Sequence, residues 1–222
     1  MIIFDCDGVL VDSEIISNRI NAQALTNLGY PISAEEVARR FIGVDSHTVR
    51  TTIISEINNL KLPKEMGDLA KVEIIEACRK ELKPLMFNFV QSIVKQNISR
   101  CVVSNNTRER VLSSLEFTNQ LQFFKDEYIF TAAQVAKGKP DPELFLLAAK
   151  QLGYHPKDCI VIEDSASGIK GALAANMKVI GFLGGAHAQY PWYLDKIKAF
   201  DIPLARNVEE LSALVIKLYA KI

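Results

Sequence analysis

Short apolar runs recur along this chain, and each stops abruptly at polar residues that precede a helix-like segment. Three of these runs occupy residues 2–4, 100–103 and 159–162 and are built mainly from isoleucine, valine, phenylalanine and cysteine. Apolar strands that alternate with helices are typical of a parallel sheet in an α/β protein. Ligands of such sheets bind beyond the carboxyl ends of the strands, so the polar residues after the three runs are expected to meet in one crevice.

The alternation of helix and strand patterns extends from residue 83 to residue 182. Expected helices span residues 85–96, 108–115, 142–152 and 168–175, and expected strands end at residues 104, 130, 162 and 182. Strands that are linked in this way by helices take right-handed crossovers. The pattern therefore predicts a parallel, three-layer α/β core.

A purely helical pattern interrupts this alternation between residues 14 and 82. Candidate helix starts in this stretch are Ser33, Asp45 or Ser46, and Pro63. No convincing strand pattern occurs in it. The interruption predicts an inserted domain of four helices over residues 14–82, while residues 1–13 and 83–222 together form the core. An insertion beside a binding crevice is expected to close over it and exclude water.

Two aspartates, Asp5 and Asp7, stand one residue apart directly after the first apolar run. Side chains alternate along a strand, so both carboxylates are expected on the same side where the strand ends. Neighbouring carboxylates repel each other, and a protein tolerates this when a divalent cation lies between them or when one keeps its proton. The alternative is a simple turn, because Asp-Gly, here Asp7 with Gly8, is a common turn pair.

One lysine is expected to face the same crevice. Lys139 stands before two prolines, Pro140 and Pro142, and an amphipathic run over residues 144–152 follows. Proline suits the first turn of a helix, so Lys139 is expected at the mouth of that helix. A solvated surface position is the alternative, because most lysines are surface charges.

These polar clusters occur in a definite order along the chain. The order is Asp-Cys-Asp-Gly-Val-Leu-Val-Asp-Ser at residues 5–13, Ser-Asn at 104–105, Gly-Lys-Pro-Asp-Pro at 138–142 and Ile-Glu-Asp-Ser at 162–165. It resembles the haloacid dehalogenase superfamily, and within it the phosphatase and β-phosphoglucomutase-like branch that carries a helical cap. The resemblance extends over essentially the whole chain. It implies a Rossmann-like core, a cap at residues 14–82 and an enzyme of phosphoryl transfer, a phosphoric monoester hydrolase.

The resemblance implies a role for each residue of these motifs. Asp5 would be the nucleophile that forms an aspartyl-phosphate, and Asp7 would be the general acid and base. Ser104 and the amides around Asn105 would hold phosphoryl oxygens, aided by the positive end of the following helix. Lys139 would pair with Asp5 and with the charge of the phosphate.

Mg²⁺ is the cofactor that the resemblance implies. Its ligands would be the carboxylates of Asp5 and Asp164 and the backbone carbonyl of Asp7, an oxygen-only set that suits magnesium better than zinc. Glu163 either points the other way along the strand or lies behind the ligands, so it ranks below Asp164 as a ligand.

The expected substrate is a small phosphate monoester, a sugar phosphate or related metabolite. β-Phosphoglucomutases carry an arginine after the Gly-Val of the cap, whereas Gly43 and Val44 are followed here by Asp45 and Ser46. This difference favours hydrolysis, although Arg50, one helical turn further on, keeps a phosphomutase open. A phosphate-binding protein without catalysis is the non-enzyme alternative, but no motif group is missing.

Further polar and aromatic residues are candidates for substrate contact or for the edge of the crevice. They are His47, Arg39, Arg40 and Arg50 in the insertion, and His187, Tyr190 and Trp192 after residue 182. The alternative for the first four is an ordinary surface charge, and for the aromatic residues it is packing.

Charge and composition limit the partners. The chain has 26 basic and 26 acidic residues and no basic run, so it lacks the electrostatic footprint of a protein that binds nucleic acid or an acidic membrane. No apolar stretch approaches the roughly 20 residues of a membrane span, and no secretory signal pattern is present, so a cytoplasmic location is expected. The four cysteines have no metal-ligand spacing and are expected to be reduced and buried. The oligomeric state stays open, and a monomer is compatible with the sequence.

Overall fold

The computed structural model describes residues 1–42, 44, 46–57 and 61–219. The chain divides into two compact units. The core unit comprises Met1–Asp12 and Lys83–Ile222, and the inserted unit comprises Ser13–Leu82. The helix start predicted at Asp45 or Ser46 concerns one residue outside the described ranges, Asp45, and one at which a helix does begin, Ser46.

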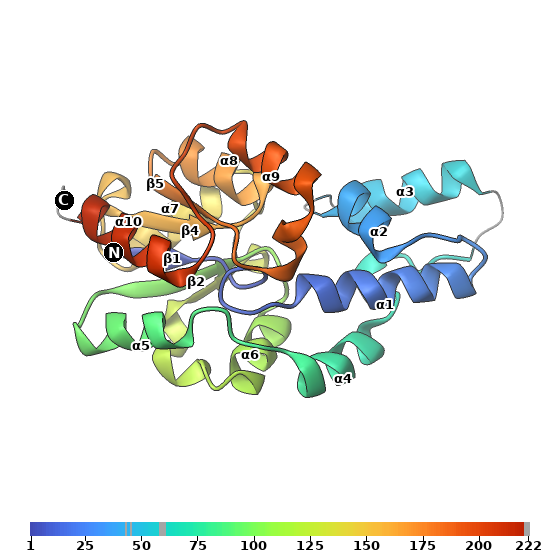
Figure 1. The fold of residues 1–222 in the computed structure, drawn as a ribbon, viewed down its shortest axis with the longest axis horizontal. Coiled ribbons are helices and arrows are strands. Elements are labelled where there is room, and N and C mark those ends of the chain that lie inside the picture. Colours follow the sequence, from blue (N-terminus) through green and yellow to red (C-terminus); the bar gives the residue numbers. More distant parts are fainter. Residues whose placement is uncertain (43, 45, 58–60, 220–222) are drawn as a thin grey trace. The chain divides into compact units, whose positions relative to one another are not determined.

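A parallel sheet of six strands forms the centre of the core unit (Figure 1). The strands are β1 (Ile2–Phe4), β2 (Arg100–Ser104), β3 (Ile129–Thr131), β4 (Ile160–Glu163), β5 (Lys178–Phe182) and β6 (Leu204–Ala205). Their order across the sheet is β3-β2-β1-β4-β5-β6. The predicted parallel α/β fold is confirmed. β6 was not predicted, because a strand of two residues leaves no periodic pattern.

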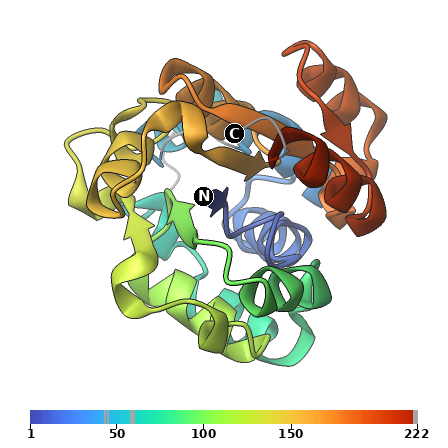
Figure 2. The same ribbon diagram turned by 90° about the vertical axis from the view of Figure 1, so that its left-hand side faces the viewer.

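Helices cover both faces of this sheet. They are α5 (Phe87–Lys95), α6 (Arg108–Phe117), α7 (Glu143–Gln151), α8 (Ala166–Ala174), α9 (Pro191–Lys198) and α10 (Val208–Tyr219). Short 3₁₀ turns lie at Leu121–Phe123, Asp126–Tyr128, Ala132–Gln134, Pro156–Asp158 and Ala186–Gln189. α7 and α8 lie on one face, and α5, α6 and α10 lie on the other (Figure 2). This is the layering that right-handed crossovers produce when the strand order reverses direction at β1.

The inner strands are buried on both faces. Phe4 of β1 is fully buried and packs edge-to-face against Phe89 of α5 and Phe124, with ring centroids 6.3 and 6.1 Å apart. The four cysteines are buried and free, as predicted; they are Cys6, Cys78, Cys101 and Cys159. Asn176, which follows α8, has a φ of 57° and so lies in the left-handed region that asparagine adopts more readily than most residues.

The central strand lies where the strand order changes direction. β1 pairs with β2 on one side and with β4 on the other, and Asp5 extends the second pairing by donating its N–H to the carbonyl of Ile162 at 3.0 Å. In α/β proteins ligands bind at such a point, beyond the carboxyl ends of the two neighbouring strands.

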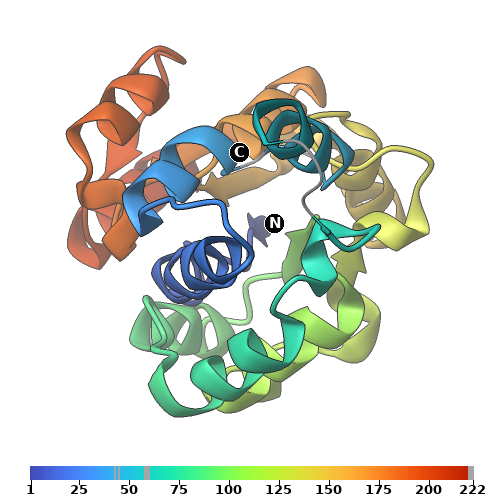
Figure 3. The same ribbon diagram turned by 90° about the vertical axis from the view of Figure 1, so that its right-hand side faces the viewer.

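The inserted unit is helical throughout its described part. It contains α1 (Glu14–Asn27), α2 (Ala34–Phe41), α3 (Ser46–Glu56), a 3₁₀ turn (Met66–Asp68) and α4 (Lys71–Glu81). α1 contacts both α2 and α4 (Figure 3). Leu25, Tyr30, Val37 and Ile53 are buried together in a small core of this unit. Its role as a cap stays a prediction.

Two of the predicted helix starts in this unit have different outcomes. Ser33 caps α2 as predicted, because its side chain accepts the N–H of Glu36 at 3.1 Å. Pro63 does not start a helix; the next helical turn begins at Met66 and α4 only at Lys71. Gly67 lies just where a helix begun at Pro63 would continue, and glycine costs about 1 kcal/mol in a helix interior.

No helix within the described ranges combines the length and the apolar character that a membrane crossing requires. The cytoplasmic location stays a prediction.

Candidate active site

Lys139 lies at the centre of the polar cluster beyond the sheet. Its side chain is 3% exposed, and Nζ donates to Oδ1 of Asp5 at 2.6 Å, to Oε1 of Glu163 at 2.7 Å and to the carbonyl of Val103 at 2.7 Å. These three acceptors match the three N–H groups of an ammonium. Burial opposes the charge, but the carboxylates of Asp5 and Glu163 outweigh it and raise the pKa of Lys139. Lys139 is therefore not a solvated surface lysine, and its two carboxylate partners favour the charged form of its side chain.

The main chain at Lys139 is held by the side chain of Asn105. The Asn105 amide donates from Nδ2 to the carbonyl of Lys139 at 2.9 Å, and its Oδ1 accepts the N–H of Lys139 at 2.8 Å. A Cβ atom on Gly138 would lie 2.6 Å from that Oδ1, so the close approach depends on glycine. The Asn105 side chain thus serves to position Lys139, while its predicted contact with substrate stays a prediction.

Three buried carboxylates meet at this edge of the sheet. One oxygen from each of Asp5, Glu163 and Asp164 lies within 4.8 Å of the others. Burial raises the pKa of Asp5 well above its usual value, and Lys139 opposes this rise only in part. Burial and the charge of Glu163 likewise raise the pKa of Asp164. Because carboxylates crowded in this way repel, a cation beside them is stabilising, and an oxygen-only donor set fits Mg²⁺.

Glu163 is engaged on both of its oxygens. Oε1 accepts from Lys139, and Oε2 accepts from the N–H and the hydroxyl of Ser165 at 2.8 and 2.9 Å. The side chain is fully buried. Glu163 therefore joins Lys139 to the start of α8, and its ranking below Asp164 as a metal ligand stays a prediction.

Asp7 has two partners that the sequence analysis did not identify. Its Oδ2 accepts from Nδ2 of Asn106 at 2.7 Å, and its Oδ1 accepts from Nη2 of Arg110 at 3.4 Å. Asn106 also donates its backbone N–H to the hydroxyl oxygen of Ser104, which is buried at the end of β2. The available signal was the place of Asn106 in the polar run after a strand, with Arg110 one helical turn further on.

His187 contacts the site as well. Its imidazole is fully buried, and Nε2 lies 2.8 Å from Oδ2 of Asp164. Tyr190 and Trp192, the other aromatic candidates in this segment, stack on each other with ring centroids 5.6 Å apart.

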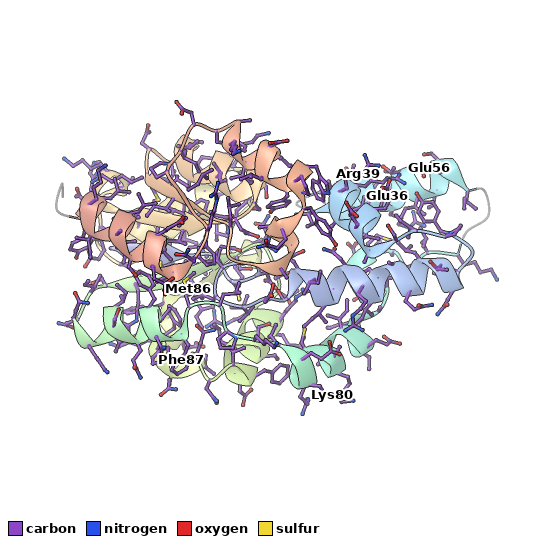
Figure 4. All side chains as sticks on the ribbon, viewed as in Figure 1. Glu36, Arg39, Glu56, Lys80, Met86 and Phe87 are labelled. Carbon is purple, nitrogen blue, oxygen red and sulfur yellow. The ribbon has the colours of Figure 1, made fainter. Side chains whose placement is uncertain are left out.

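The three arginine candidates of the inserted unit have partners within that unit. Arg39 pairs with Glu36 on the same helix at 2.7 Å (Figure 4). Arg40 pairs with Glu56, and Nε of Arg50 donates to the carbonyl of Pro63 at 3.0 Å. The side chain of His47 is exposed. The substrate roles considered for these four residues stay predictions.

Comparison with known proteins identifies the family to which this chain belongs. The sequence model of the haloacid dehalogenase-like hydrolase family matches residues 2–182. The chain belongs to this family. The family predicted from the motif order is thereby confirmed.

Two kinds of relatives agree with this assignment. A 6-phosphogluconate phosphatase from Escherichia coli (strain K12) is 31% identical to this haloacid dehalogenase-like hydrolase over 193 residues, which cover 84% of the chain and 83% of the relative. A conserved haloacid dehalogenase-like protein of unknown function from Agrobacterium tumefaciens strain C58 superposes with a TM-score of 0.84 at 33% identity and covers 98% of this chain and 97% of the other. A haloacid dehalogenase family hydrolase from Deinococcus radiodurans R1, crystallised with bound phosphate and sodium, has a TM-score of 0.78 at 25% identity, covering 98% and 95% of the two chains.

Proposed function

We propose that this hydrolase is a Mg²⁺-dependent phosphatase that cleaves a small phosphate monoester, a sugar phosphate or related metabolite, through an aspartyl-phosphate on Asp5. The observation that carries the proposal is the buried contact of Lys139 with both Asp5 and Glu163, at 2.6 and 2.7 Å. It keeps a carboxylate nucleophile and a fixed positive charge together at the carboxyl end of β1. The similarity to a 6-phosphogluconate phosphatase and to a hexitol phosphatase A, both from Escherichia coli (strain K12), supports a phosphorylated sugar or sugar derivative as the substrate.

In the first step a carboxylate oxygen of Asp5 attacks the phosphorus atom of the ester. The bond from phosphorus to the ester oxygen breaks as the bond to Asp5 forms, and the electron pair of the broken bond stays on the leaving oxygen. Asp7 gives its proton to that oxygen, which leaves as an alcohol. The acid lies two residues after the nucleophile, and Asn106 and Arg110 hold its carboxylate.

In the second step the same two aspartates release the phosphate. Asp7, now a carboxylate, takes a proton from a water molecule whose oxygen attacks the phosphorus. The bond between phosphorus and Asp5 breaks, and inorganic phosphate leaves. Asp7 regains its proton and Asp5 its carboxylate, so the cycle closes without another reactant.

The remaining groups orient the phosphoryl group and balance its charge. Lys139 supplies a fixed positive charge, and Ser104 with the amides that precede α6 would bind phosphoryl oxygens. Asp5, the backbone carbonyl of Asp7 and Asp164 would hold Mg²⁺. When bound, the ion would supply positive charge that offsets the charge of the transferring group.

The test is phosphate release from a panel of sugar phosphates, phosphorylated sugar acids, phosphoglycolate and nucleotides, with and without Mg²⁺. The expected result is Mg²⁺-dependent release that Asp5→Asn lowers by at least about 10³-fold, because the amide is no nucleophile. Asp195→Asn makes the same chemical change at an exposed position of α9 and should leave the rate unchanged.

Two results would contradict the proposal. Phosphate release that Asp5→Asn leaves intact would exclude Asp5 as the nucleophile. No release from any ester, with interconversion of phosphorylated hexoses when a hexose bisphosphate is added, would identify a phosphomutase instead.

A further inference from the structure

The segment after β5 also contacts the site, although it contains none of the sequence motifs. It contains Gly185, the 3₁₀ turn Ala186–Gln189 and, at the start of α9, Tyr193. Ala186 donates its N–H to Oδ1 of Asp12 at 3.0 Å, which ties the segment to the loop that carries Asp5 and Asp7.

His187 occupies a slot that is shaped for its ring. A Cβ atom on Gly8 or on Gly185 would lie 2.8 Å from Cε1 of the imidazole, so both positions admit the ring only as glycines. The ring of Tyr193 meets it edge-to-face, with centroids 4.8 Å apart and an interplanar angle of 90°. An imidazole confined on these sides cannot turn away from its contact.

That contact is with Asp164. Nε2 of His187 lies 2.8 Å from Oδ2 of this carboxylate, and the hydroxyl of Tyr193 donates to the main-chain carbonyl of the same residue at 3.1 Å. Asp164 is thus held at its side chain and at its backbone by one segment. A Cβ on Gly8 would also lie 2.1 Å from Oδ2, which shows how closely the carboxylate is confined.

His187 lies outside the group of carboxylates that could share an ion. Among the described residues this group consists of Asp5, Glu163 and Asp164. A residue that touches one oxygen of a ligand without joining the cluster fixes the ligand's orientation. Such outer contacts typically change metal affinity by about 10- to 100-fold.

We propose that His187 is a positioning residue that holds the carboxylate of Asp164 in place for Mg²⁺, an inference that rests on the metal site of the proposed function. Asp5 and Glu163 are each held by Lys139, so without His187 the repulsion from these two carboxylates would turn the side chain of Asp164 away in the metal-free protein. By fixing one oxygen of Asp164, the imidazole removes part of the cost of assembling the site when the ion arrives.

The experiment is calorimetric titration of the metal-free, full-length protein with MgCl₂. Three variants are compared with the wild type: His187→Ala, His187→Asn and His187→Gln. The amide nitrogen of glutamine reaches the place of Nε2, whereas that of asparagine reaches only the place of Nδ1. We expect Mg²⁺ binding about ten-fold weaker in the alanine and asparagine variants and within about three-fold of wild type in the glutamine variant.

The asparagine and glutamine variants form the matched pair, and they decide the question if His187→Ala fails to fold. Their melting temperatures without metal should agree, because both replace the ring by an amide. Wild-type Mg²⁺ affinity in both variants, or an equal loss in both, would overturn the proposal and leave His187 as packing. If the wild type itself binds no Mg²⁺, the metal site of the proposed function fails, and the inference fails with it.

Discussion

At the scale of single residues, two arginines at the start of α6 show how differently one residue type is used within a single turn. Arg110 points Nη2 to Asp7, and its side chain is 30% exposed. Arg108 pairs with Asp126 at 2.6 Å and donates to the carbonyl of Ile129, away from the site. Of these two arginines only Arg110, beside Asn106 on the other oxygen, can influence how the carboxylate of Asp7 is oriented toward a leaving group.

We therefore expect Arg110→Ala to lower kcat about ten-fold with little change in KM, because a misplaced acid slows proton transfer without weakening the grip on phosphate. Steady-state kinetics on the best ester of the panel measures this. Arg108→Ala is the control and should keep the wild-type kcat. An equal loss in both variants would mean that α6 itself has been disturbed, and it would refute a specific role for Arg110.

At the scale of elements, the start of α8 is connected to the charge balance of the site. The hydroxyl oxygen of Ser165 accepts the N–H of Gly168 at 3.1 Å as the helix cap, and the hydroxyl donates to Glu163 at 2.9 Å. A Cβ on Gly168 would lie 1.7 Å from Oε1 of Glu163, so the first turn of α8 passes directly over that carboxylate. The hydroxyl of Ser165 therefore serves both the start of α8 and the buried carboxylate of Glu163.

Ser165→Ala should consequently destabilise the core unit by about 2 kcal/mol, because it removes the cap and one donor to a buried carboxylate together. Urea unfolding followed by circular dichroism gives the value. Thr107→Ala, which removes only the cap of α6, is the comparison and should cost about 1 kcal/mol or less. If Ser165→Ala costs no more than Thr107→Ala, its hydroxyl is irrelevant to Glu163.

At the scale of the whole molecule, the inserted unit leaves and re-enters the core unit at one point. Asp12 donates its N–H to the carbonyl of Lys83 at 3.0 Å, and Leu85 donates to the carbonyl of Leu10 at 3.0 Å. The sheet and the residues proposed to hold Mg²⁺ all lie in the core unit. The insertion has buried apolar residues of its own.

Replacing residues 14–82 by a short Gly-Ser loop should accordingly leave a core unit that folds cooperatively, since joining two hydrogen-bonded neighbours costs little loop entropy. Its Mg²⁺ affinity, measured by calorimetry, should stay within about three-fold of the full chain's. A shortened protein without a cooperative melting transition would show that the core unit depends on the insertion for its stability.

The parts of this chain differ, for physical reasons, in how far their structure can be predicted from the sequence. Strands β1, β2 and β4 were predictable because burial on both faces leaves an uninterrupted apolar run. α10 was missed although its signal is present: Asn207 accepts the N–H of Glu210 as a cap, at 2.9 Å, and two acidic residues stand in the first turn. β6 was missed because a strand of two residues is too short for a period to stand out, and α9 was missed although Pro191 in its first turn is a helix-start signal.

The sequence by itself determined which residues end the strands, because hydrophobic periodicity and proline or glycine signals are local. It therefore indicated the family, the parallel sheet and the positions of Asp5, Ser104, Lys139 and Asp164. Only the tertiary structure decided which side chains touch. Three such contacts join segments that lie far apart in the sequence: Asn105 with the backbone of Lys139, Arg110 with Asp7, and His187 with Asp164. Such contacts follow from how crossovers and loops bring strand ends together in space, and no local pattern encodes that.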